Sequence, residues 1–332
     1  MNTRKTKRMA LAIRASVVAI ILTAIWISGC GTQLSATGTF DRTFEVNGPV
    51  RLELTTGSGD AHVTTGPAGE VRIHGVIHAH SWSTESAQKR SNEIAANPPV
   101  AQEGNLIRAG DAGPHLSDVS VDYTIVVPTD TEIQGKTGSG NVTVSDTHGP
   151  ASFASGSGDI TVSNIVGDVT INTGSGDVKA ENTQGQIQVT TGSGDMDITN
   201  AKGQTRLRAG SGDIQISRPG DAVEADTGSG DIQVNGAAAD LRLHSSSGAI
   251  TVDGNPGSTN YWDFRTSSGD VKLHVSPEAS LRLYAKSSSG DIDAAIPIVM
   301  EGTAGKHELR ARIGDGKARV EVETSSGGIS LH

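Results

Sequence analysis

The chain of 332 residues has little of what usually builds and crosslinks a globular core: it has one cysteine, and only 3% of its residues are aromatic. One cysteine excludes an intramolecular disulfide and an all-cysteine metal site. Because aromatic side chains are scarce, aliphatic residues must supply most of the buried surface. Basic residues are also in deficit, with 27 against 37 acidic ones and a net charge of -10. The chain therefore lacks the basic surface that binding to nucleic-acid phosphates requires, and we expect no nucleic-acid partner.

The first thirty residues have the pattern of a targeting signal. Basic residues between Arg4 and Arg14 precede an apolar run over 15–27, which is shorter than the ~20 residues of a spanning helix. The run is followed directly by Ser28, Gly29 and Cys30. A basic start, a short apolar stretch and small residues before a cleavage point are typical of a secretory signal.

Because this segment ends at the only cysteine, it resembles a bacterial lipoprotein signal. The resemblance implies cleavage after Gly29 and lipid attachment to Cys30, with the membrane as a partner. Gly31, in place of an aspartate, implies transport to the outer membrane of a diderm bacterium. The alternative is an uncleaved anchor helix that starts near Met9.

A repeat dominates the rest of the chain. Its most complete copies read GSGD, and the second glycine of each copy is called here the position-zero glycine. This glycine recurs at a spacing of 18 from Gly140 to Gly248, then at 21 twice, and finally at 37, which is long enough for two degenerate coils. We expect glycine there to supply a backbone conformation that a Cβ atom would penalise. The predicted repeat-turn residues are Gly158, Asp159, Gly176, Asp177, Gly194, Asp195, Gly212, Asp213, Gly230 and Asp231.

Two short stretches of each repeat alternate between apolar and polar residues. Ile160 and Val162 follow one position-zero glycine, and Val169 and Ile171 repeat the pattern nine residues later. Such alternation between Gly, Asn and Asp residues predicts two strands per repeat. Stacked repeats would pair in register at ~4.8 Å and fill the interior with aliphatic columns. The predicted fold class is all-β, a parallel β-solenoid of 18-residue coils, and the nine-residue offset favours two walls over three.

The N-terminal flank does not follow the repeat. Strands are expected within 40–65, at 106–108 and over 119–127, and residues 83–96 are the helix candidate, ended by two prolines. The expected domains are a signal peptide (1–29), a lipidated cysteine with a flexible tether (30–39), an irregular β section with a helical insertion (40–135) and the solenoid repeats (136–332).

These features together resemble a known family. A strand that ends in YTIVVP at 123–128, a TGSG turn and repeated GSGDI or SSGDI units are similar to the bacterial putative-adhesin family of β-helical envelope domains. The segment ETSSGGI at 323–329 also fits. The resemblance covers residues 40–332 and implies an envelope-attached solenoid of unassigned function, without catalytic residues to carry over.

The aspartates after the position-zero glycines are the strongest candidates for chemistry. Stacking would align their carboxylates ~5 Å apart, which costs ~1 kcal/mol per pair even in water. Calcium between coils would relieve this repulsion, but a calcium-binding β-roll needs an acidic turn about every nine residues. Asn141, Ala249 and Gly328 occupy the same slot without an acid. We therefore expect each Asp side chain to bond a backbone amide of its own turn.

Other candidates for chemistry are weaker. His74, His78 and His80 would share one face of a strand, but no carboxylate or cysteine is fixed beside them in the sequence, so we predict no metal site. No serine lies in a G-x-S-x-G motif, and His307 with Glu308 lacks the second histidine of H-E-x-x-H.

We therefore expect a non-enzymatic envelope protein without a cofactor. Its solenoid would act as an adhesin or scaffold and meet a glycan or protein ligand at the cell surface. Two alternatives remain open: a calcium-binding β-roll, and a polysaccharide-active β-helix enzyme. Such an enzyme would need a groove of long loops, and the constant repeat length leaves little room for them.

Overall fold

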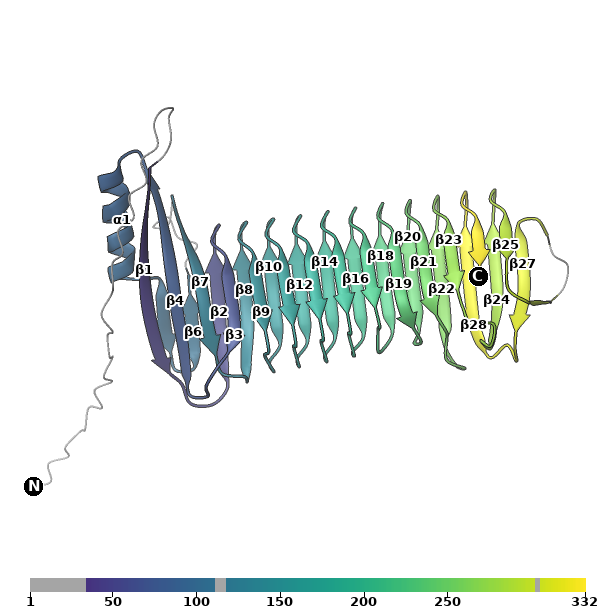
Figure 1. Cartoon of the computed structure of the whole chain (residues 1–332), viewed down its shortest axis with the longest axis horizontal. Helices are drawn as coiled ribbons and strands as arrows, with labels where there is room; N and C mark the ends of the chain where they lie inside the picture. The colour runs from purple at the N-terminus through teal and green to yellow at the C-terminus, as the bar shows by residue number, and fades with distance from the viewer. Residues whose placement is uncertain (1–33, 111–117, 302–304) are drawn as a thin grey trace, which may run out of the picture.

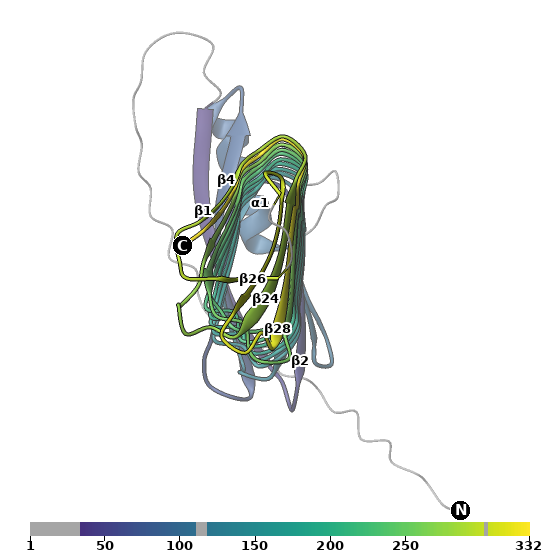
Figure 2. The same ribbon diagram turned by 90° about the vertical axis from the view of Figure 1, so that its right-hand side faces the viewer.

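The computed structural model describes residues 34–110, 118–301 and 305–332, which form an elongated stack of strands (Figure 1). Seen along the long axis, the stack has two facing walls joined by turns at both edges (Figure 2). Each wall is one continuous sheet, of 14 and 15 strands. The predicted all-β solenoid is confirmed, and its cross-section has two walls.

The first wall, sheet A, consists of β1 (Leu34–Glu45), β3 (Ala61–Thr65), β4 (Glu70–Ser81), β7 (Val119–Val127), β9 (Val142–Ser145), β11 (Ile160–Ser163), β13 (Val178–Glu181), β15 (Met196–Thr199), β17 (Ile214–Ser217), β19 (Ile232–Ala237), β21 (Ile250–Gly254), β23 (Val271–His274), β25 (Ile292–Ala294) and β29 (Ile329–Leu331).

The second wall, sheet B, consists of β2 (Val50–Thr56), β5 (Val100–Glu103), β6 (Leu106–Ala109), β8 (Thr131–Thr137), β10 (Ala151–Ser155), β12 (Val169–Thr173), β14 (Ile187–Thr191), β16 (Thr205–Ala209), β18 (Val223–Thr227), β20 (Leu241–Ser245), β22 (Tyr261–Thr266), β24 (Leu281–Ser287), β26 (Val299–Met300), β27 (Glu308–Ile313) and β28 (Ala318–Thr324).

Each regular repeat is one coil, with one strand in each sheet and a turn at each edge. Neighbouring coils pair in parallel with equivalent positions opposite one another, so that Ile160 faces Val178 and Val169 faces Ile187. The inward residues of these strands are buried, while the residues between them, such as Gln188, point outward. The 18-residue period therefore fixes both the register and the aliphatic columns of the core.

Two aromatic rings enter the narrow interior because the neighbouring strand has a glycine. Phe153 lies opposite Gly135 of the preceding coil, and a Cβ on Gly135 would come within 2.5 Å of the ring. Phe40 lies opposite Gly75, where a Cβ would come within 2.2 Å of the ring. At these two positions the ring fills the space that a neighbouring side chain would otherwise take.

The order of the coils departs from the order of the sequence at both ends of the stack. Strands β28 and β29 lie between the coil β22–β23 and the coil β24–β25. In the same way, β2 and β3 lie between β6–β7 and β8–β9. The segment after Gly290 does not form the two degenerate coils for which its length leaves room. That segment instead includes β26 and β27, and β27 pairs antiparallel with β24 and so covers the last coil.

The N-terminal end of sheet A is antiparallel and carries the helix. Strands β1 and β4 form a long antiparallel ladder, and helix α1 (Thr84–Ala96) packs against both (Figure 1). The helix begins after Ser83, whose hydroxyl accepts a hydrogen bond from the Ser86 N–H, and it buries Ala87, Ser91 and Ile94. The helix predicted over 83–96 is therefore present. Within the described ranges, no helix has the length and apolar character needed to cross a membrane.

Part of the segment predicted to be a flexible tether is a strand. Residues 34–39 form the first half of β1, with Leu34 opposite Ser81 and Thr39 opposite Val76. The linker prediction did not take into account that Ala36 and Phe40 lie on the inward face of one strand, where both are buried. The long pairing with β4 orders this segment. The signal peptide, Gly29 and Cys30 lie outside the described residues.

Candidate functional site

The turns at the two edges of the solenoid carry different side chains. At the GSGD edge the chain passes from sheet B to sheet A through the GSGD turns. At the other edge, called here the asparagine edge, it passes from sheet A to sheet B. Because the coils stack in register, any residue type that recurs in a turn becomes a row along that edge.

The position-zero glycines are required by close stacking of the coils. A Cβ on Gly176 would lie 2.1 Å from the carbonyl oxygen of Gly158, and one on Gly194 would lie 2.0 Å from that of Gly176. None of the five predicted turn glycines has a positive φ. The expectation of a special backbone conformation is therefore wrong, since glycine serves here to let one turn approach the next.

A hydroxyl fixes most of these turns from inside. The Gly176 N–H donates to Oγ1 of Thr173 at 3.1 Å, and the Gly194 N–H donates to Oγ1 of Thr191 at 2.9 Å. The Thr227 hydroxyl also donates to the carbonyl oxygen of Gly212 in the preceding coil. The small residue three positions before the glycine is therefore a hydrogen-bonding group in most coils.

The aspartates of the GSGD edge form a ladder between coils. Oδ1 of Asp159 accepts the backbone N–H of Asp177 at 2.9 Å, and Asp177 accepts the N–H of Asp195 at 2.8 Å. The expectation that each side chain bonds an amide of its own turn is wrong, because stacking points the N–H of the next turn at the carboxylate. Asn141 accepts the Asp159 N–H in the same way at 2.9 Å, so the contact needs an oxygen atom and not a charge.

This ladder borders an acidic groove of about 370 Å³. In the described part of the chain, no three or more His, Cys, Asp or Glu residues are grouped to hold a metal ion. Two of the three strand histidines have separate partners, since His74 bonds Asp41 at 2.8 Å and His78 bonds Asp122 at 2.9 Å. Both carboxylates come from neighbouring strands, which is why the sequence did not reveal them.

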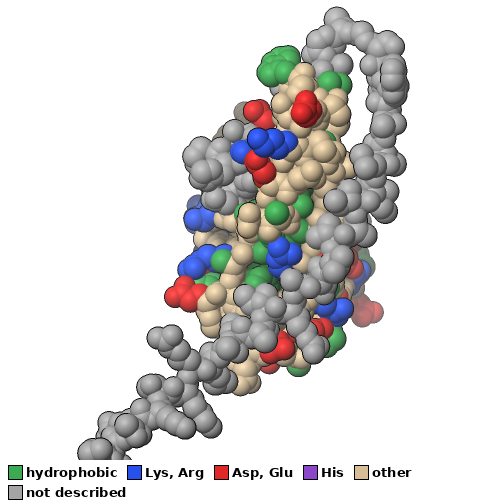
Figure 3. Space-filling model, turned by 90° about the vertical axis from the view of Figure 1, so that its left-hand side faces the viewer, with side chains coloured by type: hydrophobic (Ala, Val, Ile, Leu, Met, Phe, Trp, Pro, Cys, Tyr) green, Lys and Arg blue, Asp and Glu red, His purple; other side chains and the backbone are tan. Residues whose placement is uncertain are grey.

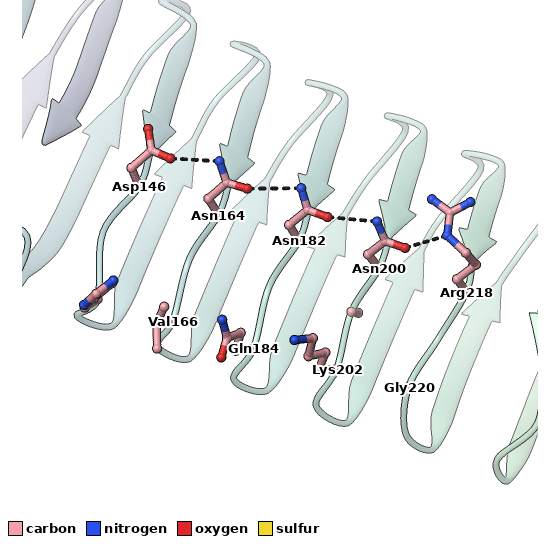
Figure 4. A pocket seen from close by; sticks show the side chains of 11 residues that line it. Asp146, Asn164, Val166, Asn182, Gln184, Asn200, Lys202, Arg218 and Gly220 are labelled. Atoms are coloured by element: carbon pink, nitrogen blue, oxygen red, sulfur yellow. Dashed lines mark hydrogen bonds between the residues drawn. The ribbon is translucent and has the colours of Figure 1, made fainter.

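The asparagine edge carries a second ladder, which sequence reasoning missed. Asn164, Asn182 and Asn200 lie 18 residues apart, and each donates an amide N–H to the side chain one coil earlier, at 2.8 to 3.0 Å (Figure 4). All three have φ of 55°, the left-handed region that asparagine tolerates better than most residues. Their 18-residue spacing was the available signal.

The two ends of this ladder match its direction. Asp146 begins it and only accepts, from Asn164, whereas Arg218 ends it and only donates, to Asn200. An ionised carboxylate has no donor and a guanidinium has no acceptor. Residue type and position thus agree at both ends, and all the hydrogen bonds of the ladder run in one direction.

The asparagine ladder forms one side of a groove of about 640 Å³, called here the asparagine groove. The other side is a row of varied residues on the same coils: His148, Val166, Gln184, Lys202 and Gly220. Figure 4 shows the two rows running in parallel, with the ladder joined by its hydrogen bonds. With coils ~4.8 Å apart, the five rungs span ~19 Å. The groove therefore suits an extended ligand.

Each asparagine amide in the ladder keeps part of its hydrogen-bonding capacity. Asn182 donates one N–H to Asn164 and accepts one from Asn200. A carboxamide has two N–H groups and two acceptor lone pairs. One donor and one acceptor per rung thus remain beside the groove. The side chains of Gln184 and Lys202 are exposed there and make no hydrogen bond or ion pair within the described ranges.

At the C-terminal end a half-buried phenol links β22 to β28, the strand inserted beside it. The Tyr261 hydroxyl in β22 donates to the Glu321 carboxylate in β28. Burial, together with this bond, raises the pKa of Tyr261 to about 12. The hydrogen bond from Tyr261 in turn lowers the pKa of Glu321. The guanidinium of Arg319 lies 5.6 Å from the centre of the Tyr261 ring.

Three solved structures are similar to the chain at low identity. A putative cell adhesion protein from Clostridium sporogenes has 10% identity and a TM-score of 0.22, with 89% of this chain and 99% of that chain covered. A putative adhesin from Bacteroides fragilis has 14% identity, a TM-score of 0.32 and coverage of 89% and 97%. A putative adhesin from Parabacteroides merdae has 8% identity, a TM-score of 0.30 and coverage of 89% and 96%. No protein with a curated description matches the chain.

The family match covers the repeat region. The Toastrack DUF4097 family matches residues 112–256 and 221–332, which together make up more than half of the chain. This agrees with the resemblance that the GSGD and SSGD repeats suggest. The chain belongs to the Toastrack DUF4097 family.

Proposed function

We propose that this protein is a lipid-anchored, non-enzymatic binding module of the cell envelope, and that its asparagine groove takes a linear glycan. The observation that carries the proposal is the ladder of Asn164, Asn182 and Asn200, with a free donor and a free acceptor beside the groove at every rung. Sugar hydroxyls both donate and accept, so they complement such pairs. A linear polymer can repeat the contact along the three asparagine rungs.

The groove suits binding better than hydrolysis. Glycoside hydrolysis generally uses two carboxylates on either side of the scissile bond. Among the residues that line the groove, Asp146 is the one carboxylate, and it already accepts a hydrogen bond from Asn164. Lys202 and Arg218 lie at the other end and favour a glycan with carboxylate groups there.

The anchor is supported by the sequence alone. A basic start, a short apolar run and the segment ending in Gly29 and Cys30 agree on one cleavage point. A lipid on Cys30 would hold the solenoid at a membrane of the envelope, in the outer membrane if Gly31 directs export. Labelled palmitate in a bacterial host tests this step, with incorporation expected in the wild type and lost in Cys30→Ser. Equal label on both proteins would reject the anchor.

A binding and turnover assay tests the groove. The full chain, purified in detergent, is incubated with peptidoglycan sacculi, with neutral linear polysaccharides and with uronic-acid polysaccharides. The proposal expects retention on at least one of these glycans, competition by its soluble fragments and no release of new reducing ends. Folded protein that is retained on none of them contradicts the glycan proposal, and release of reducing ends favours the enzyme alternative.

A further inference from the structure

One aromatic side chain of the described residues is almost fully in solvent. Trp82 is 80% exposed, whereas Trp262 is buried in the core. Trp82 directly follows β4 and precedes Ser83, the N-cap of α1. Isolated exposed apolar side chains are common, so exposure alone carries no conclusion. A conclusion follows instead from the position of Trp82 beside the first residue of β1.

Trp82 lies at the corner where β1 begins. Ser81, its neighbour, is paired with Leu34, the first residue of β1, and Leu34 is itself 42% exposed. Only four Cα steps separate Leu34 from Cys30. A fully extended chain of that length reaches at most ~14 Å. A lipid on Cys30 therefore holds this corner close to the bilayer.

We propose that Trp82 and Leu34 contact the headgroup layer of the membrane and seat the N-terminal end of the solenoid on it. This rests on the proposed lipid anchor. Tryptophan favours the interface because its ring is apolar and its N–H is polar. Seen from this end, visible side chains of Lys, Arg, Asp and Glu are interspersed (Figure 3). The contact thus does not depend on a surface of one charge, and a zwitterionic bilayer is sufficient.

This contact sets the orientation of the stack. β1 is the edge strand of sheet A at this end, and β9 to β17, which lead into the asparagine groove, are its fifth to ninth strands. At ~4.8 Å per strand, the groove lies roughly 20 to 40 Å from β1 along the axis. A solenoid standing on the membrane would thus hold the groove clear of the lipid.

Quenching of tryptophan fluorescence tests the contact. The full lipidated chain is reconstituted in phosphatidylcholine vesicles with and without bromine on the acyl chains, and compared with Trp82→Ser. We expect bromine to reduce the emission of the wild type and to leave Trp82→Ser nearly unchanged, because Trp262 is inside the fold and Trp26 is removed with the signal peptide when the lipidated protein matures. Equal quenching of the two proteins would overturn the contact.

A second variant tests the orientation. Val299 is an exposed side chain in β26 at the far end of sheet B. A Val299→Trp change in the Trp82→Ser background reports on that end, and we expect no added quenching; quenching there as strong as at Trp82 would overturn the standing orientation. Flotation of the same samples separates the two proposals. A chain that does not float with vesicles overturns both the anchor and the contact, whereas a floating chain with unquenched Trp82 overturns only the contact.

Discussion

Oδ1 of Asp159 accepts the backbone N–H of Asp177, which lies 18 residues later in the sequence and one coil further along the stack, at 2.9 Å. The carboxylate column that raised the calcium alternative is thus already engaged in backbone hydrogen bonds. Asn141 makes the same contact without a charge. The ladder is therefore satisfied by the chain itself.

The first prediction concerns this ladder and calcium. Asp177→Asn keeps the acceptor for the Asp195 N–H and should leave the free energy of unfolding unchanged or slightly raised, since one like charge is removed. Asp177→Ala loses the bond and should cost ~1 kcal/mol. Thermal melts in chelator and in millimolar calcium check both variants and the wild type, and we expect calcium to have little effect. A site filled at 100 times its dissociation constant would add ~2.7 kcal/mol, so a rise of that size would support the β-roll.

The second prediction concerns buried hydroxyls. Oγ1 of Thr183 is buried without a hydrogen-bond partner, whereas Oγ1 of Thr191 accepts the Gly194 N–H at 2.9 Å. Thr183→Val should therefore stabilise the fold by ~1 kcal/mol, and Thr191→Val should destabilise it by a similar amount. Chemical denaturation measures both. Two variants that shift in the same direction would contradict the hydrogen-bond assignment.

A third prediction follows from the end of the asparagine ladder. Arg218 has φ of 53°, in the left-handed region that costs most side chains ~1 kcal/mol but asparagine less. Arg218→Asn relieves this strain, and its amide can donate to Asn200 as the other rungs do. Stability should rise by up to ~1 kcal/mol in denaturant melts. A marked loss would mean that the long guanidinium arm, and not the rung geometry, stabilises this turn.

The fourth prediction is a pH dependence. The folded-state pKa of Tyr261 is raised to about 12 from the ordinary value of 10.0, so the fold binds this proton more tightly than the unfolded chain does. That contribution is complete below pH 10.0 and is lost as the pH rises toward about 12. Tyr261→Phe should therefore lose less stability over this range than the wild type. Tyr284→Phe, which leaves Tyr261 in place, should keep the wild-type slope, and indistinguishable slopes in all three proteins would refute the assignment.

The period and the alternation were sufficient to predict the coils. The register of β11 with β13 follows directly from equal spacing, because a shift by one residue would expose Ile160 and bury Thr161. The helix over 83–96 could also be predicted from local signals, since its N-cap residue and the two prolines that end it directly flank it in the sequence.

Other features depend on contacts that no local pattern specifies. The position of β28 between β22 and β24 depends on packing between coils. The repeat sequence of β28 resembles those of the other coils, so it does not specify this position. The hydrogen bond of each Asp side chain was predicted to lie within its own turn. The actual contact joins residues 18 apart and forms only when the coils stack. In the sequence, the asparagines were interpreted only as turn residues that bound the strands, since Asn164 by itself is an ordinary turn residue. Its hydrogen bond to Asn182 emerges only between coils.

The central claim is that the asparagine groove binds a linear glycan. Gln184→Ala with Lys202→Ala removes two exposed groove side chains, and Gln188→Ala with Lys179→Ala is the matched control, with the same residue types and the same charge change outside the groove. Calorimetry with soluble fragments of the glycan that retains the wild type measures the dissociation constant of each full-length protein. The account predicts that the groove variant binds about tenfold more weakly, as the loss of two polar contacts implies, and that the control binds like the wild type. Equal dissociation constants for the two variants, or no binding by the wild type, would contradict it.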